Sequence, residues 1–176
     1  MDTLKDKRGL TEQQAIERYR CRNYPKPALT ADIVIFRREE DWQVLLVRRG
    51  GHPFLGKWAL PGGFANEQEP VEKTAARELQ EETGLSGQTL NLVDLFSTPN
   101  RDPRGWVVSA AYCAILQGKA QPRAGDDAAD AAWFSIRREK TGLTLQSEIL
   151  TLPEADLAFD HGEILKKALN TANLPV

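Results

Sequence analysis

The segment GFANEQEPVEKTAARELQEETGL, from Gly63 to Leu85, decides how the rest of the sequence is interpreted. Residues 70–83 of it carry helix signals: a proline stands where the first helical residue belongs, and a glycine follows where a left-handed cap belongs. Glu78, Glu81 and Glu82 then share one face of this helix, because each residue turns the helix by about 100°. Like charges at these spacings destabilise a helix by roughly 0.2–0.5 kcal/mol per pair, which favours a compensating cation.

The donor atoms of this face indicate the kind of cation. Carboxylate oxygens are the ligands that Mg²⁺ prefers, and Mg²⁺ keeps part of its shell for water and substrate phosphates. If the three glutamates are considered alone, the alternative to a metal site is an acidic helix face that is simply exposed to solvent. The sequence LPGG at 60–63 weakens that alternative, since glycines let the backbone approach a ligand closely. Glu69 and Arg77 have opposite charges, and we expect them to pair and hold the loop against the helix.

The spacing of these residues resembles the Nudix box, G-x5-E-x7-R-E-U-x-E-E-x-G-U, in which U is aliphatic. All nine defined positions are filled, by Gly63, Glu69, Arg77, Glu78, Leu79, Glu81, Glu82, Gly84 and Leu85. The sequence is therefore identified as a member of the Nudix hydrolase family.

The resemblance implies an α/β fold: an α/β/α sandwich with a mixed β-sheet, in which the box forms a loop, a helix and a second loop. It also implies hydrolysis of a nucleoside diphosphate linked to a further group, with Mg²⁺ as the cofactor and Mn²⁺ as the alternative. By position, Glu78, Glu81 and Glu82 resemble the catalytic and metal-binding glutamates, and the carbonyl of Gly62 resembles a further ligand. Glu69 and Arg77 resemble the structural ion pair of the box. Which carboxylate acts as the base stays open.

Outside the box, the pattern predicts further elements on both sides of it. A capping box formed by Thr11 and Gln14 begins a short polar helix. Strands are expected at 29–36, 42–47, 90–96, 106–116 and 131–136, and the first two form a hairpin. Residues 50–63 are expected to be a loop, and residues 157–169 a closing helix. We expect one Nudix domain over 1–176, with a helical extension at 1–23 and a core at 24–170.

The composition indicates a soluble protein. The 176 residues carry a formal net charge of −2, which argues against a nucleic-acid partner. The N-terminus has no apolar signal region, and the longest apolar run is too short to span a bilayer, so we expect a cytoplasmic protein without a membrane partner. Cys21 and Cys113 lack metal-site spacing and are expected to be free thiols.

Segments around the box resemble one subgroup, the ADP-ribose pyrophosphatases of NAD metabolism, together with related transcriptional regulators. These segments are YPKPALTADIVIF (24–36), RRGGHPFLGKWALPGGF (48–64), TPNRDPRGWVVSAAY (98–112), AGDDAADAAWF (124–134) and LAFDH (157–161). The subgroup implies hydrolysis of ADP-ribose to AMP and ribose 5-phosphate, and by this resemblance a homodimer is a plausible assembly for the protein. The alternatives are another Nudix substrate, such as NADH, a dinucleoside polyphosphate or an oxidised nucleotide, and a non-catalytic ADP-ribose sensor that binds DNA.

The candidate substrate-binding residues lie in loops. Arginine forks bind phosphate, which makes candidates of four residues: Arg48, Arg49, Arg101 and Arg104. The alternative for Arg101 and Arg104 is a surface salt bridge within their loop beside Asp102, and the alternative for one of Arg48 and Arg49 is a solvated side chain. Phe54 and Trp58 are expected either to stack on adenine or to pack under their loop. His161 is either a substrate contact or structural. Asp127, or Asp126 beside it, is either an acid outside the box or part of a plain turn.

Overall fold

The computed structural model describes residues 4–116 and 128–176. The helices are α1 (Glu12–Arg20), α2 (Val71–Thr83) and α3 (His161–Thr171), with a 3-10 turn at Glu154–Asp156. The strands are β1 (Ala28–Arg38), β2 (Trp42–Arg49), β3 (Trp58–Ala59), β4 (Gly62–Phe64), β5 (Asn91–Phe96), β6 (Val107–Ile115), β7 (Ala128–Glu139), β8 (Gly142–Gln146) and β9 (Thr151–Pro153).

The strands form one mixed sheet with β1 near its middle. The order is β5-β6-β1-β2-β7-β8-β9, while β3 pairs with β2 and β4 pairs with β1. β1 runs parallel to β6 and antiparallel to β2 and β4. A central strand buried on both faces reads as a continuous apolar run, and every residue from 30 to 36 in β1 is buried.

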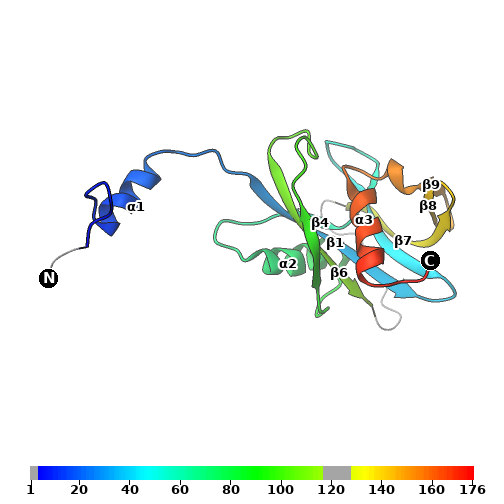
Figure 1. Cartoon of the computed structure of the whole chain (residues 1–176). Helices are drawn as coiled ribbons and strands as arrows, with labels where there is room; N and C mark the ends of the chain where they lie inside the picture. The colour runs from blue at the N-terminus through cyan, green and yellow to red at the C-terminus, as the bar shows by residue number, and fades with distance from the viewer. Residues whose placement is uncertain (1–3, 117–127) are drawn as a thin grey trace.

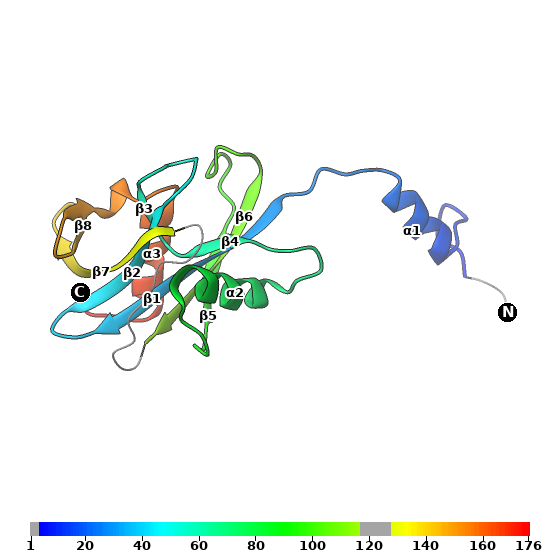
Figure 2. The same ribbon diagram turned by 180° about the vertical axis from the view of Figure 1, so that it is seen from behind.

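Helices cover both faces of this sheet, which confirms the expected α/β/α sandwich. Because side chains alternate along a strand, Ile33 and Ile35 join the core under α2, whereas Val34 and Phe36 join the core under α3. In Figure 1, α3 lies in front of the sheet, and in Figure 2, seen from behind, α2 lies in front. Sequence-distant segments therefore meet around the central strand.

Several predicted elements are confirmed. α2 ends at Gly84, whose φ of 71° is left-handed, and Thr11 and Gln14 form the capping box of α1. β1 and β2 form the predicted hairpin. Pro70 lies one position earlier than expected, as the N-cap of α2.

Other boundaries were wrong. The expected loop at 50–63 contains β3 and the start of β4, and the predictions omitted β8 and β9. These strands have two to five residues, too few to show a period of two. α3 begins at His161 instead of 157, because residues 154–156 form a 3-10 turn and Leu157 is extended.

The N-terminal segment lies apart from the rest of the chain. α1 has no buried residue, and the chain between α1 and β1 leads away from the sheet (Figure 1). No helix in the described ranges is long and apolar enough to cross a membrane.

Candidate active site

A cleft of about 470 Å³ lies where β1, β2, the chain leading into α2 and the start of α3 meet. This volume is in the range of small-molecule sites, which is roughly 300–1,000 Å³. The cleft is lined by Thr30, Asp32, Val47, Arg48, Arg49, Gly50, Gly51, His52, Ala59, Leu60, Gly62, Gly63, Phe64, Glu78, Glu82, Arg101, Asp102, Arg104, Phe159 and His161. Most of these residues are polar or glycine, so the cleft suits a charged ligand.

Two of the three box glutamates lie on the cleft wall. Glu78 and Glu82 line the cleft, whereas Glu81 does not and its side chain is 57% exposed. The backbone N–H of Gly62 donates to Oε2 of Glu82 at 2.9 Å. A Cβ on Gly63 would lie 2.5 Å from either carboxylate oxygen of Glu78. The glycine pair therefore lets the chain pass directly against these carboxylates.

Arg77 holds the loop and the helix of the box together. Its Nε lies 3.0 Å from Oε1 of Glu69, and its Nη2 donates to the carbonyl oxygen of Phe64 at 3.0 Å. Its Nη1 lies 2.6 Å from Glu78 and 2.8 Å from Glu81. The Arg77 guanidinium, helped by a backbone N–H, lowers the pKa of Glu69 to about 2. The ion pair expected from the sequence thus forms, and Arg77 also offsets two other carboxylates.

The carboxylates of this wall supply the oxygen ligands that a hard divalent cation prefers. Three carboxylates on one turn of α2 supply oxygen donors, and burial raises the pKa of Glu78 although Arg77 opposes that shift. In the described part of the chain, no three acidic, His or Cys side chains gather around one point. Glu78 and Glu81 point to Arg77, and Glu82 points to Gly62. Binding a cation would require these side chains to turn, which long flexible carboxylates can do.

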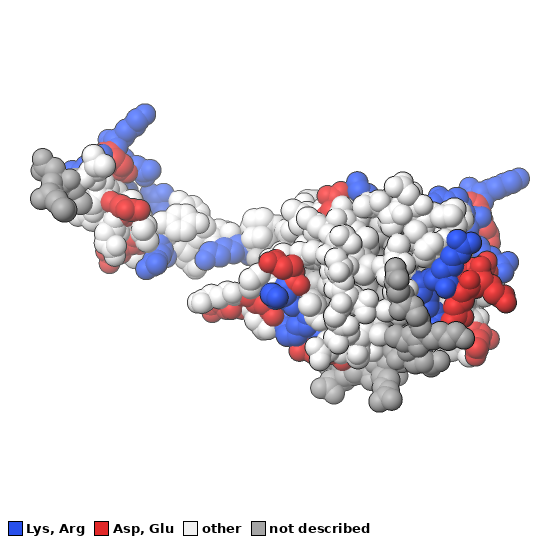
Figure 3. Space-filling view, turned by 90° about the horizontal axis from the view of Figure 1, so that it is seen from below, with Lys and Arg blue, Asp and Glu red and all other residues white. Residues whose placement is uncertain are grey.

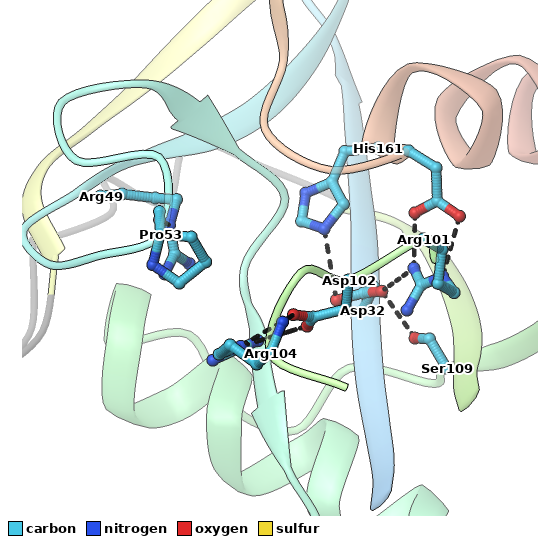
Figure 4. A network of polar contacts seen from close by, with 9 residues as sticks. Asp32, Arg49, Pro53, Arg101, Asp102, Arg104, Ser109 and His161 are labelled. Atoms are coloured by element: carbon cyan, nitrogen blue, oxygen red, sulfur yellow. Dashed lines mark hydrogen bonds and ion pairs between the residues drawn. The ribbon is translucent and has the colours of Figure 1, made fainter. Parts of the chain in front are cut away.

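A buried polar network forms another part of the cleft lining (Figure 4). Ser109 Oγ donates to Oδ2 of Asp32 at 2.6 Å, and Nη2 of Arg101 lies 3.4 Å from the same oxygen. Arg101 also makes a bidentate pair with Asp160, through Nε at 2.8 Å and Nη2 at 2.5 Å. Burial alone would lower the pKa of Arg101, but the two carboxylates outweigh burial and raise it. The network joins β1, β6, the loop after β5 and the start of α3.

His161 links this network to the glycine pair. Its Nδ1 accepts the backbone N–H of Leu60 at 2.8 Å, so the ring proton lies on Nε2, which is 3.6 Å from Oδ1 of Asp32. Burial lowers the pKa of His161, and the carboxylate of Asp32 opposes this only in part. His161 is therefore neutral at neutral pH and holds the chain two residues before Gly62.

Two further arginines of the cleft lining, Arg49 and Arg104, lie beside aromatic rings. Nε of Arg104 donates to Oδ1 of buried Asp102 at 3.0 Å, and its guanidinium lies 4.6 Å from the ring centre of Phe64 and 5.4 Å from that of Phe159. The guanidinium of Arg49 lies 4.9 Å from the ring centre of Phe159. Two arginines thus flank one aromatic ring, which suits a ligand with both phosphate and a flat ring.

Some predicted roles need correction. Arg101 lines the cleft, but its side chain is 5% exposed and its guanidinium is bound to two carboxylates, so it links the elements around it and is not a free phosphate ligand. Trp58 is buried and packs against Phe134 with 4.9 Å between ring centres. The prediction that it stacks on adenine is therefore wrong, and its packing role is the one that the structure shows. Phe54 contacts Phe159 at 4.7 Å and does not line the cleft; it packs under the loop.

Other candidates have different outcomes. Arg48 and Arg49 both line the cleft, and their Nε atoms donate to the backbone carbonyls of Gly56 and Pro53. Asp127, with Asp126, lies outside the described residues. The sequence predictions missed a set of cleft residues, namely Asp32, Phe64, Asp102, Phe159 and, behind them, Ser109. A buried acid inside the apolar run of β1 was the one available signal for Asp32.

The fold and this box define a class of protein. A sequence model described as the NUDIX domain matches residues 26–151, which is most of the chain. The chain belongs to the Nudix family.

Two relatives and one solved structure show which Nudix proteins this chain resembles. An ADP-ribose pyrophosphatase from Methanocaldococcus jannaschii is 36% identical over 93% of this chain and 85% of that protein. The ADPR responsive transcriptional repressor NtrR from Acinetobacter baylyi is 32% identical over 93% of this chain, but the match spans only 61% of the repressor. Among solved structures, the NUDIX domain of Shewanella oneidensis NrtR complexed with ADP ribose has a TM-score of 0.73 at 30% identity, covering 93% of this chain and 99% of that one.

Proposed function

We propose that this protein hydrolyses the pyrophosphate bond of ADP-ribose, giving AMP and ribose 5-phosphate. The observation that carries this proposal is the complete box, with Glu78 and Glu82 on the wall of a polar cleft of about 470 Å³. The similarity to an ADP-ribose pyrophosphatase over 93% of the chain supports the choice of substrate. The reaction adds water across one P–O–P linkage and needs no other reactant.

The proposed cofactor is a divalent cation, Mg²⁺ in the first place with Mn²⁺ as a substitute. Glu78, Glu81, Glu82 and the carbonyl of Gly62 would hold it, because all four offer the oxygen donors that such ions prefer. When bound, the cation supplies positive charge that offsets the charge of the pyrophosphate and activates water. Glu78 and Glu82 are also the candidates for accepting a proton from water, since they line the cleft and Glu81 does not.

The other residues of the cleft would bind and orient the substrate. Arg48, Arg49 and Arg104 supply positive charge for the two phosphates at the cleft wall. Phe64 and Phe159 present rings beside Arg104, so a base or ribose can pack there while a phosphate meets the guanidinium. Holding the pyrophosphate in one orientation lowers the reaction barrier, because part of the entropy lost on reaching the transition state is already lost on binding.

A panel of nucleotides tests the proposal. ADP-ribose, NADH, a diadenosine polyphosphate and an oxidised deoxynucleoside triphosphate are each incubated with enzyme and Mg²⁺, and the products are separated by chromatography. We expect ADP-ribose to show the highest kcat/KM, with AMP and ribose 5-phosphate in equal amounts. Glu82→Gln is the matched inactive control, and it keeps the size of the side chain. A higher kcat/KM for another compound would replace ADP-ribose as the substrate.

A non-catalytic sensor is the second candidate, because one relative is an ADPR responsive repressor. The intact box opposes this candidate, since a sensor has no need to keep every carboxylate. ADP-ribose that binds tightly to the wild-type protein and is not hydrolysed at saturating Mg²⁺ would favour it. DNA binding at physiological salt would then be the next measurement.

A further inference from the structure

The backbone of Gly62 is directed away from β1 and towards the box glutamates. Gly62 pairs with β1 in an antiparallel ladder, and the carbonyl of Pro61, one residue earlier, accepts the N–H of Ile33 at 2.8 Å. Successive residues of such a ladder direct their backbone groups to opposite sides, so those of Gly62 are directed away from β1. Its N–H meets the carboxylate of Glu82 there, at 2.9 Å. The carbonyl of Gly62 is therefore offered on the side of β4 where Glu82 lies.

The chain from Leu60 to Gly62 has little freedom, so a displacement at one end reaches the other. The ring of Pro61 fixes its own φ, and a residue that precedes proline, here Leu60, is restricted to extended conformations. Leu60 is buried, and its N–H donates to Nδ1 of His161 at 2.8 Å. Moving the amide of Leu60 therefore moves Gly62 with it.

His161 is a rigid acceptor for this N–H. It is the first residue of α3, which is packed into the core through residues such as Ile164, and its own ring is buried beside that of Phe159. Its Nε2 lies 3.6 Å from Oδ1 of Asp32, whose other oxygen accepts the hydroxyl of Ser109 (Figure 4). A carboxylate held in this place favours the ring tautomer with its proton on Nε2 and its lone pair on Nδ1.

We propose that His161 is a positioning residue for the divalent cation: through Leu60 it holds Gly62 so that the Gly62 carbonyl and the Glu82 carboxylate are directed to one ion. This inference rests on the proposed function, which brings the cation to the box. A buried N–H without an acceptor is costly, so without Nδ1 the segment shifts until Leu60 finds another partner. The carbonyl of Gly62 then leaves its place beside Glu82, and the cation binds more weakly.

Three substitutions of His161 separate the acceptor from the bulk of the ring. His161→Asn keeps an oxygen acceptor near the position of Nδ1, His161→Gln places its amide near the position of Nε2, and His161→Phe keeps a flat ring without an acceptor. We expect the dissociation constant of the cation to rise roughly 10- to 100-fold in His161→Phe and His161→Gln, the usual cost of losing a residue that orients a metal ligand. His161→Asn should retain most of the affinity.

Binding of Mn²⁺ alone is the first readout, and no substrate is present. Electron paramagnetic resonance measures the free Mn²⁺ during a titration of the full-length protein. Asp and Glu also lie on the surface, many of them beside Lys or Arg (Figure 3), so some weak surface binding is expected. Glu82→Gln gives this background. Turnover of ADP-ribose is then measured over a series of Mg²⁺ concentrations, and high Mg²⁺ should restore part of the turnover of His161→Phe.

Lys166→Met is the matched control for a loss of stability alone. Lys166 lies on α3, and its Nζ is 2.8 Å from the buried carboxylate of Glu154, which would lose its cation. Neither residue lines the cleft. The Tm should therefore fall in Lys166→Met, while its affinity for Mn²⁺ stays at the wild-type value.

Four results overturn the proposal. Wild-type affinity for Mn²⁺ in a folded His161→Phe would show that the ring is only structural, and the proposed hydrolysis would still stand. Equal losses in His161→Asn and His161→Gln would exclude Nδ1 as the group that matters. In the wild-type protein, the absence of a scalar coupling across the hydrogen bond between the backbone nitrogen of Leu60 and Nδ1 of His161 would remove the contact itself. A wild-type protein that binds Mn²⁺ no better than Glu82→Gln would remove the cation site, and the proposed cofactor with it.

Discussion

Replacing Gly62 by alanine should mainly lower the stability of the fold, whereas replacing Gly63 by alanine should mainly lower turnover. A Cβ on Gly63 would lie 2.5 Å from the oxygens of Glu78, which are the far end of a flexible side chain. A Cβ on Gly62 would instead collide with the backbone of β1, including Cα of Asp32 at 3.0 Å, and φ at Gly62 is +155°. The first change moves one proposed metal ligand, and the second strains the central strand.

The magnitudes follow from these contacts. Gly62→Ala should lose about 1–3 kcal/mol through overpacking and about 1–3 kcal/mol through backbone strain. At roughly 2–4 °C per kcal/mol for a chain of this size, the Tm should fall by about 4–24 °C. Gly63→Ala should change the Tm by less than about 3 °C, because Glu78 can swing away. Its turnover should fall by roughly 100-fold, the cost of a displacement near 1 Å in a catalytic group.

Calorimetry and steady-state kinetics separate the two effects. The Tm is measured for both variants, and kcat and KM for ADP-ribose are measured over a series of Mg²⁺ concentrations. Gly51→Ala is the stability control, since nothing lies within 4 Å of a Cβ there. Wild-type turnover in Gly63→Ala would refute the reasoning, as would a Tm loss equal to that of Gly62→Ala.

Three further changes probe other parts of the structure. The pKa of Glu69 is lowered from 4.5 to about 2, so the stabilisation from its pairing with Arg77 is complete above about pH 4.5, falls progressively below it and is lost once the pH is below about 2; in acid titrations Glu69→Gln should flatten this part of the stability curve, and an unchanged curve would contradict the assignment. Asp102→Asn should release Arg104 and raise KM for ADP-ribose roughly three- to tenfold with little change in kcat, whereas a fall in kcat alone would argue against a binding role. Phe134→Ala removes a fully buried ring and should cost about 3–5 kcal/mol in chemical denaturation; a loss below about 1 kcal/mol would mean that the core collapses around the gap.

The box could be predicted from the sequence because its contacts are local. The ion pair of Glu69 and Arg77 spans eight residues, and the helix between them fixes its geometry. The cap at Gly84 likewise depends on the backbone of one residue. Such features follow from spacing alone, since few other parts of the chain can change them.

The buried network could not be predicted in the same way. Asp32 and Ser109 are 77 residues apart, and they meet only because β1 pairs in parallel with β6. Asp160 looks like an N-cap for α3, yet its side chain makes no capping hydrogen bond, because it is paired with Arg101. The pairing of strands and the placement of α3 are long-range outcomes, which a local pattern does not contain.

The two loop arginines show what decides the role of a residue. Arg101 and Arg104 are three residues apart and equally suited to phosphate by chemistry. The side chain of Arg101 is 5% exposed and that of Arg104 is 40% exposed. Arg104 can therefore meet a ligand while it stays paired with Asp102, whereas Arg101 would have to leave its buried carboxylates. Breaking a buried pair costs roughly 3–5 kcal/mol, more than one phosphate contact would return.

The active site therefore depends on contacts from both faces of the sheet. From the side of α2, the carboxylate of Glu82 accepts the N–H of Gly62. From the side of α3, the ring of His161 accepts the N–H of Leu60, two residues earlier. Gly62 also pairs with Asp32 on β1, whose carboxylate lies against both Arg101 and His161. A chain that kept the whole box but lost His161 at the start of α3 would lose the contact that holds Leu60 from that face, so residues outside the box help to set the geometry in which its carboxylates work.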